Sequence, residues 1–181
     1  DDAPYAPLTK ARPYVEEIQT SPGRLRIAFC SENPSNTPLH PDVQATFDDT
    51  VRLLGELGHI MIEKKSLPID WRKMYRAQGA VSGAMQVASL EEWSEELKRP
   101  LDETTLEWLA LAGYRAAQKI TPKDLGLGLQ TLRQISRQIL ALWREFDVLL
   151  SPVTITPPPE IGHLDPSNVQ AREFNRRQSR V

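Results

Sequence analysis

Residues 24–68 read RLRIAFCSENPSNTPLHPDVQATFDDTVRLLGELGHIMIEKKSLP, and this stretch decides the fold class. Residues 25–30 alternate charged and apolar side chains and then become apolar, which predicts a strand. Apolar residues recur every three or four positions over residues 41–57, which predicts an amphipathic helix that begins at Pro41. A glycine that suits the left-handed end of a helix follows, and residues 59–63 form a second short strand. The unit is long enough for a parallel crossover, with the two strands either adjacent or separated by another strand.

The rest of the chain adds three predicted helices and one more strand. Small and apolar residues favour a helix over residues 69–90, and Pro100 ends the charged stretch that follows it. Residues 103–118 and 122–146 form the other two helices, and the second of these opens with a T-x-x-D sequence typical of a capping box. An apolar run at residues 147–150 follows directly and predicts a buried strand. The predicted fold class is therefore α/β, with helices packed on a small sheet.

Composition and charge place the chain among ordinary globular proteins. Of its 181 residues, 40% are hydrophobic and 25% are charged, and 22 basic side chains nearly balance 24 acidic ones. The formal net charge of -2 argues against a dedicated nucleic-acid-binding protein, which is normally basic. The single cysteine, Cys30, excludes an internal disulfide framework and a cysteine-based zinc site. No apolar run has the length of a membrane span, so we expect no membrane association and a cytoplasmic location.

No local motif identifies an active site. The sequence has no G-x-S-x-G element and no glycine-rich loop that would hold a phosphate group, and its histidines lack helical metal-ligand spacing. We therefore expect no metal and no cofactor. His40 is interpreted as a capping or surface residue, and Cys30 as a small buried hydrophobe. The arginines of residues 165–181 indicate an exposed terminal segment rather than a nucleic-acid site.

The order of several segments is more specific than any one of them. SPGRLRIAFC at residues 21–30, HPDVQATFDDTVRLLGELGH at residues 40–59 and FDVLLSPVTITPPPEIG at residues 146–162 follow one another along the chain. Together with the proline-rich lead-in, this set resembles the latter part of the amidase signature family. The resemblance covers nearly the whole chain. It implies a mixed α/β sheet wrapped by helices, in a family that hydrolyses carboxylic amides.

The resemblance also implies that the catalytic residues lie outside this chain. The family uses a Ser–Ser–Lys triad with its nucleophile in a Gly/Ser-rich loop, and neither that loop nor the lysine-containing segment has a match here. We therefore assign no catalytic residue and expect the chain by itself to be inactive. Three strands make a thin sheet for so many helices, so we expect strands from elsewhere in a parent protein to complete it. The expected division is a lead-in at residues 1–24, a partial amidase-type domain at 25–164 and a polar tail at 165–181.

The resemblance implies that this chain supplies part of the wall of a substrate pocket. Residues 151–154 match the family segment that approaches the substrate cavity, which makes Ser151, Pro152 and Thr154 substrate-binding candidates. Ordinary strand-to-loop hydrogen bonding is an equal alternative for the two hydroxyl residues. Further candidates come from a variable region that shapes specificity in the family, although packing in the core is the favoured interpretation of these side chains: Val81, Met85, Trp71 and Trp108.

The expected function is hydrolysis of a small-molecule amide by a parent protein to which this chain contributes core and pocket wall. The first alternative is a glutaminase segment like that of the glutamyl-tRNA amidotransferases, which would need other protein chains and a tRNA as partners. The second alternative is a free-standing, non-catalytic α/β module that binds a partner or a small ligand. The sequence names neither the amide nor the oligomeric state, and a homo-oligomer stays open.

Overall fold

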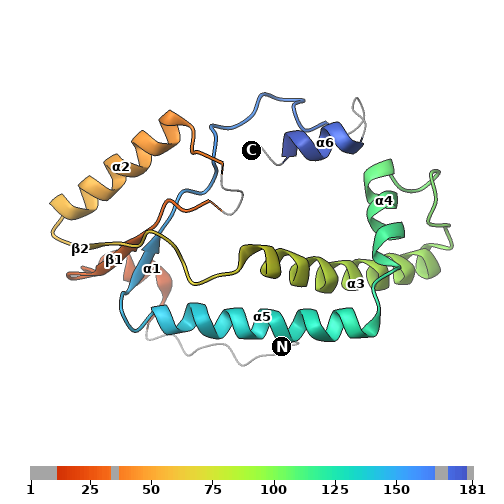
Figure 1. Cartoon of the computed structure of the whole chain (residues 1–181), viewed down its shortest axis with the longest axis horizontal. Helices are drawn as coiled ribbons and strands as arrows, with labels where there is room; N and C mark the ends of the chain where they lie inside the picture. Colours follow the sequence, from red (N-terminus) through yellow and green to blue (C-terminus); the bar gives the residue numbers. More distant parts are fainter. Residues whose placement is uncertain (1–11, 34–36, 166–170, 179–181) are drawn as a thin grey trace.

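A computed structural model describes residues 12–33, 37–165 and 171–178 (Figure 1). The remaining parts of the predicted lead-in and tail lie outside the described residues. The elements follow one another in this order: α1 (Tyr14–Glu17), β1 (Arg26–Phe29), α2 (Pro41–Glu56), β2 (Ile60–Glu63), α3 (Trp71–Leu97), α4 (Trp108–Ala117), α5 (Pro122–Leu142), β3 (Val148–Leu150) and α6 (Ala171–Gln178). All three predicted strands are therefore present.

The three strands form one sheet in the order β2-β1-β3. The central strand buries Ile27 and Ala28, whose side chains point to opposite faces of the sheet. In Figure 1, α2 lies on one side of the sheet and α5 on the other. The α/β fold class is confirmed, and β1 and β2 are direct neighbours with no strand between them. Where the resemblance implies a mixed sheet, both strand pairs among the described residues are parallel.

An ion pair fixes the start of β3 beside β1. The carboxylate of Asp147 accepts hydrogen bonds from the Arg26 backbone N–H at 2.8 Å and from its guanidinium at 2.8 and 3.3 Å. These bonds favour the ionised carboxylate, so they hold the pKa of Asp147 below its ordinary value. The backbone N–H of Asp147 in turn donates to the Arg26 carbonyl at 2.8 Å. The pair therefore joins two segments that are far apart in the sequence at the point where their strands begin to align.

We expect the substitution Asp147→Asn to lower thermal stability at neutral pH but not in acid. Because the folded-state pKa of Asp147 lies below the unfolded value of about 3.9, the ion pair stabilises the fold fully above that value. This stabilisation is lost as the pH falls through the folded-state pKa. Thermal unfolding of both proteins between about pH 7 and about pH 3 measures the difference, which should shrink toward the acid end. A difference that is independent of pH would contradict a role for the Asp147 charge.

Helix starts follow the predicted capping chemistry. The Thr121 side chain accepts from the backbone N–H of Asp124, and the Asp124 carboxylate accepts from the backbone N–H of Thr121, so the predicted capping box opens α5. α2 begins at Pro41, as predicted, and Nδ1 of His40 accepts from the Asp42 N–H at 3.2 Å. The interpretation of His40 as a capping residue is confirmed.

Three other helix boundaries differ from the prediction. α3 continues past residue 90 to Leu97, because its charged last part consists largely of good helix formers. α4 begins at Trp108 rather than at residue 103, because the Asp102 carboxylate accepts from the Thr104 N–H and hydroxyl in a separate turn. α5 ends at Leu142 rather than at residue 146, since residues 143–145 turn out of the helix before Phe146 enters the core.

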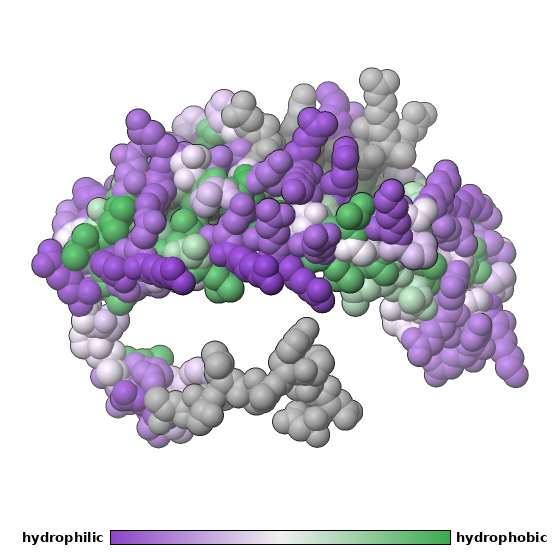
Figure 2. Space-filling model, turned by 60° about the horizontal axis from the view of Figure 1, so that its bottom comes forward, coloured by the Kyte–Doolittle hydropathy of each residue, from purple (hydrophilic) through white to green (hydrophobic). Residues whose placement is uncertain are grey.

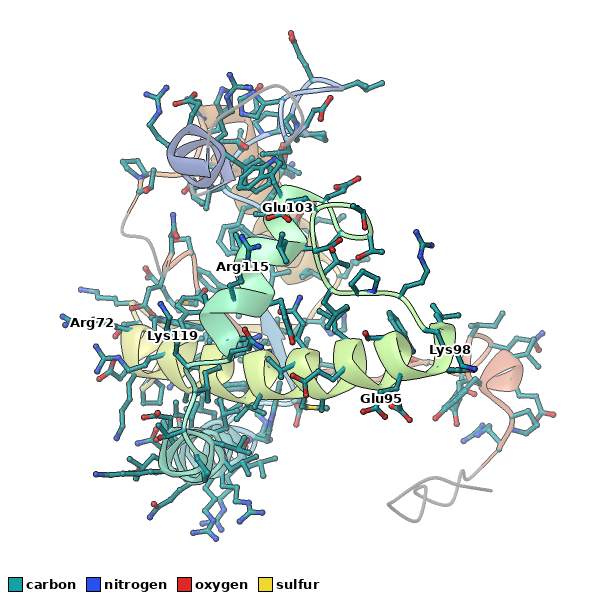
Figure 3. All side chains as sticks on the ribbon, turned by 90° about the vertical axis from the view of Figure 1, so that its right-hand side faces the viewer. Arg72, Glu95, Lys98, Glu103, Arg115 and Lys119 are labelled. Atoms are coloured by element: carbon teal, nitrogen blue, oxygen red, sulfur yellow. The ribbon has the colours of Figure 1, made fainter. Side chains whose placement is uncertain are left out.

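Small residues let the helices α3, α4 and α5 approach closely. A Cβ atom added at Gly128 of α5 would lie 3.0 Å from the Ala77 carbonyl oxygen and 3.2 Å from the Val81 side chain of α3. A Cβ added at Gly83 of α3 would lie 3.3 Å from the Cβ of Ala117 of α4. Figure 3 shows α3 crossing above α5, which is viewed nearly end-on. The prediction that small side chains of the first of these helices pack against a neighbouring backbone is confirmed.

The last described helix, α6, docks on α4. The buried ring of Phe174 meets Trp108 edge-to-face, with ring centroids 6.2 Å apart. Arg177 donates to the His163 carbonyl at 3.2 Å, and hydrogen bonds from Arg176 and Arg177 lower the pKa of Glu173 to about 2. The sequence indicated only a polar, exposed tail here, and the structure corrects this by placing a helix with a buried aromatic anchor in it.

The buried core of the described residues is small compared with their exposed apolar surface. Eleven apolar residues are buried, whereas seventeen large apolar side chains are exposed. Figure 2 shows the face that carries α5, where hydrophobic residues lie between hydrophilic ones over much of the surface. Val153 and Ile161, in the segment after β3, are almost fully exposed. Exposed apolar surface of this extent is typical of a face that contacts another part of a protein or a ligand.

Candidate functional site

A groove with a volume of about 490 Å³ lies at the carboxyl end of β3. One wall is Leu150, the last residue of the strand, with the segment that follows it up to Pro158. The other wall is the first half of α2, with these lining residues: Asp42, Val43, Thr46, Phe47 and Thr50. Figure 1 shows the segment after β3 passing the start of α2.

The topology explains why a groove forms at this point. The strands β1 and β3 are parallel neighbours, and the chain leaves β1 toward α2 on one side of the sheet. The helix that precedes β3 lies on the other side. Open parallel sheets bind ligands outside the carboxyl ends of strands where the connections diverge in this way. The groove is therefore at the position where such a sheet is expected to hold a small molecule.

Backbone hydrogen bonds fix the two walls relative to each other. The Cys30 N–H donates to the Leu150 carbonyl at 3.0 Å, which extends the β1–β3 pairing to the end of the strand. The His40 N–H donates to the Ile155 carbonyl at 2.8 Å and joins the start of α2 to the proline-rich segment. The groove is thus held between segments that are hydrogen-bonded both at the end of the sheet and at the start of α2.

The surface of the groove is mainly apolar. Phe47 is buried beneath it and contacts Phe29 of β1, with ring centroids 6.4 Å apart. Asp42 is the only ionisable side chain among the described lining residues. Ser151 has an exposed side chain at the end of β3, whereas three of the groove threonines, Thr46, Thr50 and Thr154, already donate their hydroxyl protons to backbone carbonyls of this chain. This lining can hold an apolar group and offers little charge to a ligand.

The structure brings together three of the seven substrate-binding candidates that the sequence predicted. Ser151, Pro152 and Thr154 all line the groove. Val81 packs against Gly128 between α3 and α5, and Met85 is 66% exposed on α3. Trp108 contacts Phe174. These last three residues do not line the groove, and their assignment to a substrate site stays a prediction that the geometry of this groove does not support.

The wall formed by α2 was not identified from the sequence. Its Val43 and Phe47 fall on the apolar stripe of the predicted helix, where they look like ordinary core positions. The available signal was the order strand, helix, strand, which places the start of the helix beside the carboxyl end of its preceding strand. Trp71, another predicted candidate, does not line the groove either. Its ring stacks on that of Tyr75, with ring centroids 6.4 Å apart, and its buried indole N–H has no acceptor among the described residues.

The chain is similar in sequence to a known family along almost its whole length. Residues 1–178 match the protein-family model described as Amidase. This chain belongs to the amidase family. The resemblance drawn from residues 21–30, 40–59 and 146–162 is therefore confirmed for the amidase chain.

Curated relatives of the amidase chain are much longer than the chain itself. It is 25% identical over 158 residues to 6-aminohexanoate-cyclic-dimer hydrolase of Paenarthrobacter ureafaciens, which covers 86% of this chain and 32% of that protein. It is 23% identical over 163 residues to a lipoamidase of Enterococcus faecalis, which covers 90% of this chain and 20% of that protein. The amidase chain thus spans about a third of the length of the first relative and a fifth of the second.

Solved structures agree with the fold. The amidase chain superimposes on a 6-aminohexanoate cyclic dimer hydrolase with a TM-score of 0.75 at 25% identity, which covers 94% of this chain and 36% of that one. It superimposes on a bacterial aryl acylamidase of the amidase signature enzymes with a TM-score of 0.64 at 16% identity, which covers 76% and 28%. The predicted likeness to the amidase signature fold is confirmed.

The remaining candidate groups of the amidase chain have structural roles. Cys30 is buried, and burial raises the pKa of its thiol, which disfavours the reactive thiolate. The Nδ1 atom of His59 accepts from the Leu25 N–H at 3.2 Å. Within the described ranges, no cluster of histidine, cysteine and carboxylate side chains could hold a metal ion. None of the helices that the structure describes is long and apolar enough to cross a membrane.

Proposed function

We propose that this chain is part of an amidase that hydrolyses the C–N bond of a carboxylic amide, and that it supplies one wall of the substrate groove. The observation that carries the proposal is the position of residues 151–154. This segment was assigned to the pocket wall from the family resemblance, and it lines a groove at the carboxyl end of a parallel sheet. Family membership supplies the reaction class.

In this proposal the Ser–Ser–Lys triad lies outside residues 1–181. The sequence has no Gly/Ser-rich loop, which supports that placement. Ser151 is the serine that lines the groove, and it has no hydrogen bond to a basic side chain within the described residues. A serine hydroxyl needs an adjacent base to become a nucleophile, so Ser151 is assigned to binding and not to catalysis.

The chemistry leaves a positioning role for this chain. In acyl transfer an activated serine attacks the amide carbonyl, and N–H groups stabilise the negative charge that develops on its oxygen. The groove would hold the substituent of the amide against α2 and limit the orientations of the carbonyl group. Such positioning lowers the barrier without any covalent contribution from the wall.

Amide hydrolysis tests the proposal with two proteins, residues 1–181 and the longest translated product that contains them. The substrates are the 6-aminohexanoate cyclic dimer, a lipoyl-lysine amide and acetanilide, chosen from the names of the relatives, with glutamine for the amidotransferase alternative. We expect the longer protein to hydrolyse at least one of the first three and the 181-residue chain to hydrolyse none. Hydrolysis by the chain alone would overturn the placement of the triad. Failure of the longer protein on every amide would overturn the amidase proposal.

A further inference from the structure

We propose that the groove selects an uncharged, apolar substituent of the amide and that the hydroxyl of Ser151 donates a hydrogen bond to a carbonyl oxygen of the same ligand. The inference rests on the proposed function, because it names the substrate class for the same groove. It follows from three features of the lining: its size and apolar walls, its charge, and the hydrogen bonds that its hydroxyl groups already make.

Size and walls favour an aliphatic or aromatic group. A volume of about 490 Å³ lies within the range of small-molecule pockets in proteins. Apolar contacts come from Val43 and Phe47 on one wall and from Leu150, Pro152 and Pro157 on the other. A group that places its apolar surface against these residues removes that surface from water, which is favourable.

Charge disfavours a carboxylate in the groove. No lysine or arginine belongs to the described lining, so a bound anion would lose hydration and gain no ion pair. The start of α2 carries the partial positive charge of a helix N-terminus, but Asp42 in the first turn offsets it. The Asp42 side chain is exposed, so it attracts cations only weakly.

Hydrogen bonding leaves Ser151 and Thr156 as the available side-chain donors of the described lining. The Thr46 hydroxyl donates to the Asp42 carbonyl at 2.8 Å, and the Thr50 hydroxyl donates to the Thr46 carbonyl at 2.7 Å. The Thr154 hydroxyl donates to the Thr156 carbonyl at 2.8 Å. Each of these protons is used within the chain, whereas the hydroxyls of Ser151 and Thr156 make no such bond among the described residues. Ser151 is the more exposed of the two, so we assign it as the donor to a carbonyl oxygen of the ligand.

Binding of hexanamide and hexanoate to the 181-residue chain tests the inference, since the two probes share an alkyl chain and differ in charge. Titrations followed by ¹H–¹⁵N NMR should give shifts at residues 150–154, with hexanoate bound at least about tenfold more weakly. Ser151→Ala should weaken hexanamide binding by roughly two- to tenfold. Asp42→Asn should reduce the ratio of the affinities for hexanamide and hexanoate, because without the Asp42 charge the N-terminus of α2 attracts the carboxylate of hexanoate. Ser136→Ala, which removes an exposed hydroxyl of α5 outside the groove, is the matched control.

Each outcome supports or overturns the inference. The inference is overturned if the two probes bind equally, if hexanoate binds more tightly, or if the shifts are confined to residues outside the groove. All three results are measured on the unsubstituted chain, so they do not depend on whether a variant folds. The separate hydrolysis assay of the longer protein distinguishes this failure from failure of the proposed function. If the longer protein hydrolyses one of the assayed amides but hexanamide gives no groove shifts, the proposed function is supported and the binding preference is overturned. If hexanamide gives groove shifts but the longer protein hydrolyses no amide, the binding preference is supported and the amidase proposal is overturned.

Discussion

Replacing Phe146 by alanine is expected to lower the free energy of unfolding by about 3–5 kcal/mol. Phe146 has 0% exposure, the lowest of the large side chains, and its ring meets Trp143 edge-to-face at 5.3 Å. Truncation removes its transfer free energy and leaves a cavity where α5 turns into β3. Urea unfolding followed by circular dichroism measures the change.

Two further substitutions make the test of Phe146 specific. Phe146→Leu keeps most of the volume, so it should lose less than half as much stability as the alanine variant. Trp143→Ala removes a ring that is 42% exposed, and its effect should also be smaller. A loss below about 1 kcal/mol for Phe146→Ala would contradict the central position of this ring in the core.

Replacing Gly128 by leucine is expected to destabilise the chain by about 3 kcal/mol, near the upper end for overpacking. Even a Cβ at this position would lie 3.0 Å from the Ala77 carbonyl oxygen, and a backbone atom cannot move aside as a flexible side chain can. The gain in helix propensity, about 0.8 kcal/mol, is too small to offset the separation of α3 from α5. Thermal unfolding should show a melting temperature lower by several degrees.

Gly126, in the same helix, provides the matched control for Gly128. A Cβ added there meets no atom within 4 Å, so Gly126→Leu should stabilise the chain by about 0.5–1 kcal/mol through helix propensity alone. The two variants make the same chemical change two positions apart on α5. Equal effects of the two substitutions would contradict the close contact between α3 and α5.

The elements that the sequence predicted are those specified by local chemistry. The alternation in residues 25–30, the stripe of α2 and the capping box at Thr121 each depend on neighbouring residues, and each is confirmed. α6 was missed because its anchor is a contact between Phe174 and Trp108, which are far apart in the sequence and in no common periodic pattern. The end of α3 was missed because it lies in a charged stretch. Charged residues such as glutamate are also good helix formers, so a change to charged side chains does not mark the end of a helix.

The residues of the candidate site were likewise predicted only in part. Ser151, Pro152 and Thr154 were found because they match the segment that approaches the substrate cavity in the amidase signature family, and they line the groove. Val81 and Met85 were chosen because they match a variable region of the family, and their apolar character was equally compatible with packing against a neighbouring helix. The wall from α2 depends on the hydrogen bond between His40 and Ile155, a pairing that no sequence pattern indicates.

The anchoring of the segment after β3 has a consequence for binding thermodynamics. This segment begins in the sheet, is bonded to the start of α2 through Ile155, and contains three consecutive prolines from Pro157 to Pro159, which restrict its backbone. A ligand that enters the groove therefore orders little of the polypeptide, and most of its contact free energy is retained as affinity. Preorganisation of this kind predicts a binding entropy less unfavourable than that of a loop that closes only around its ligand.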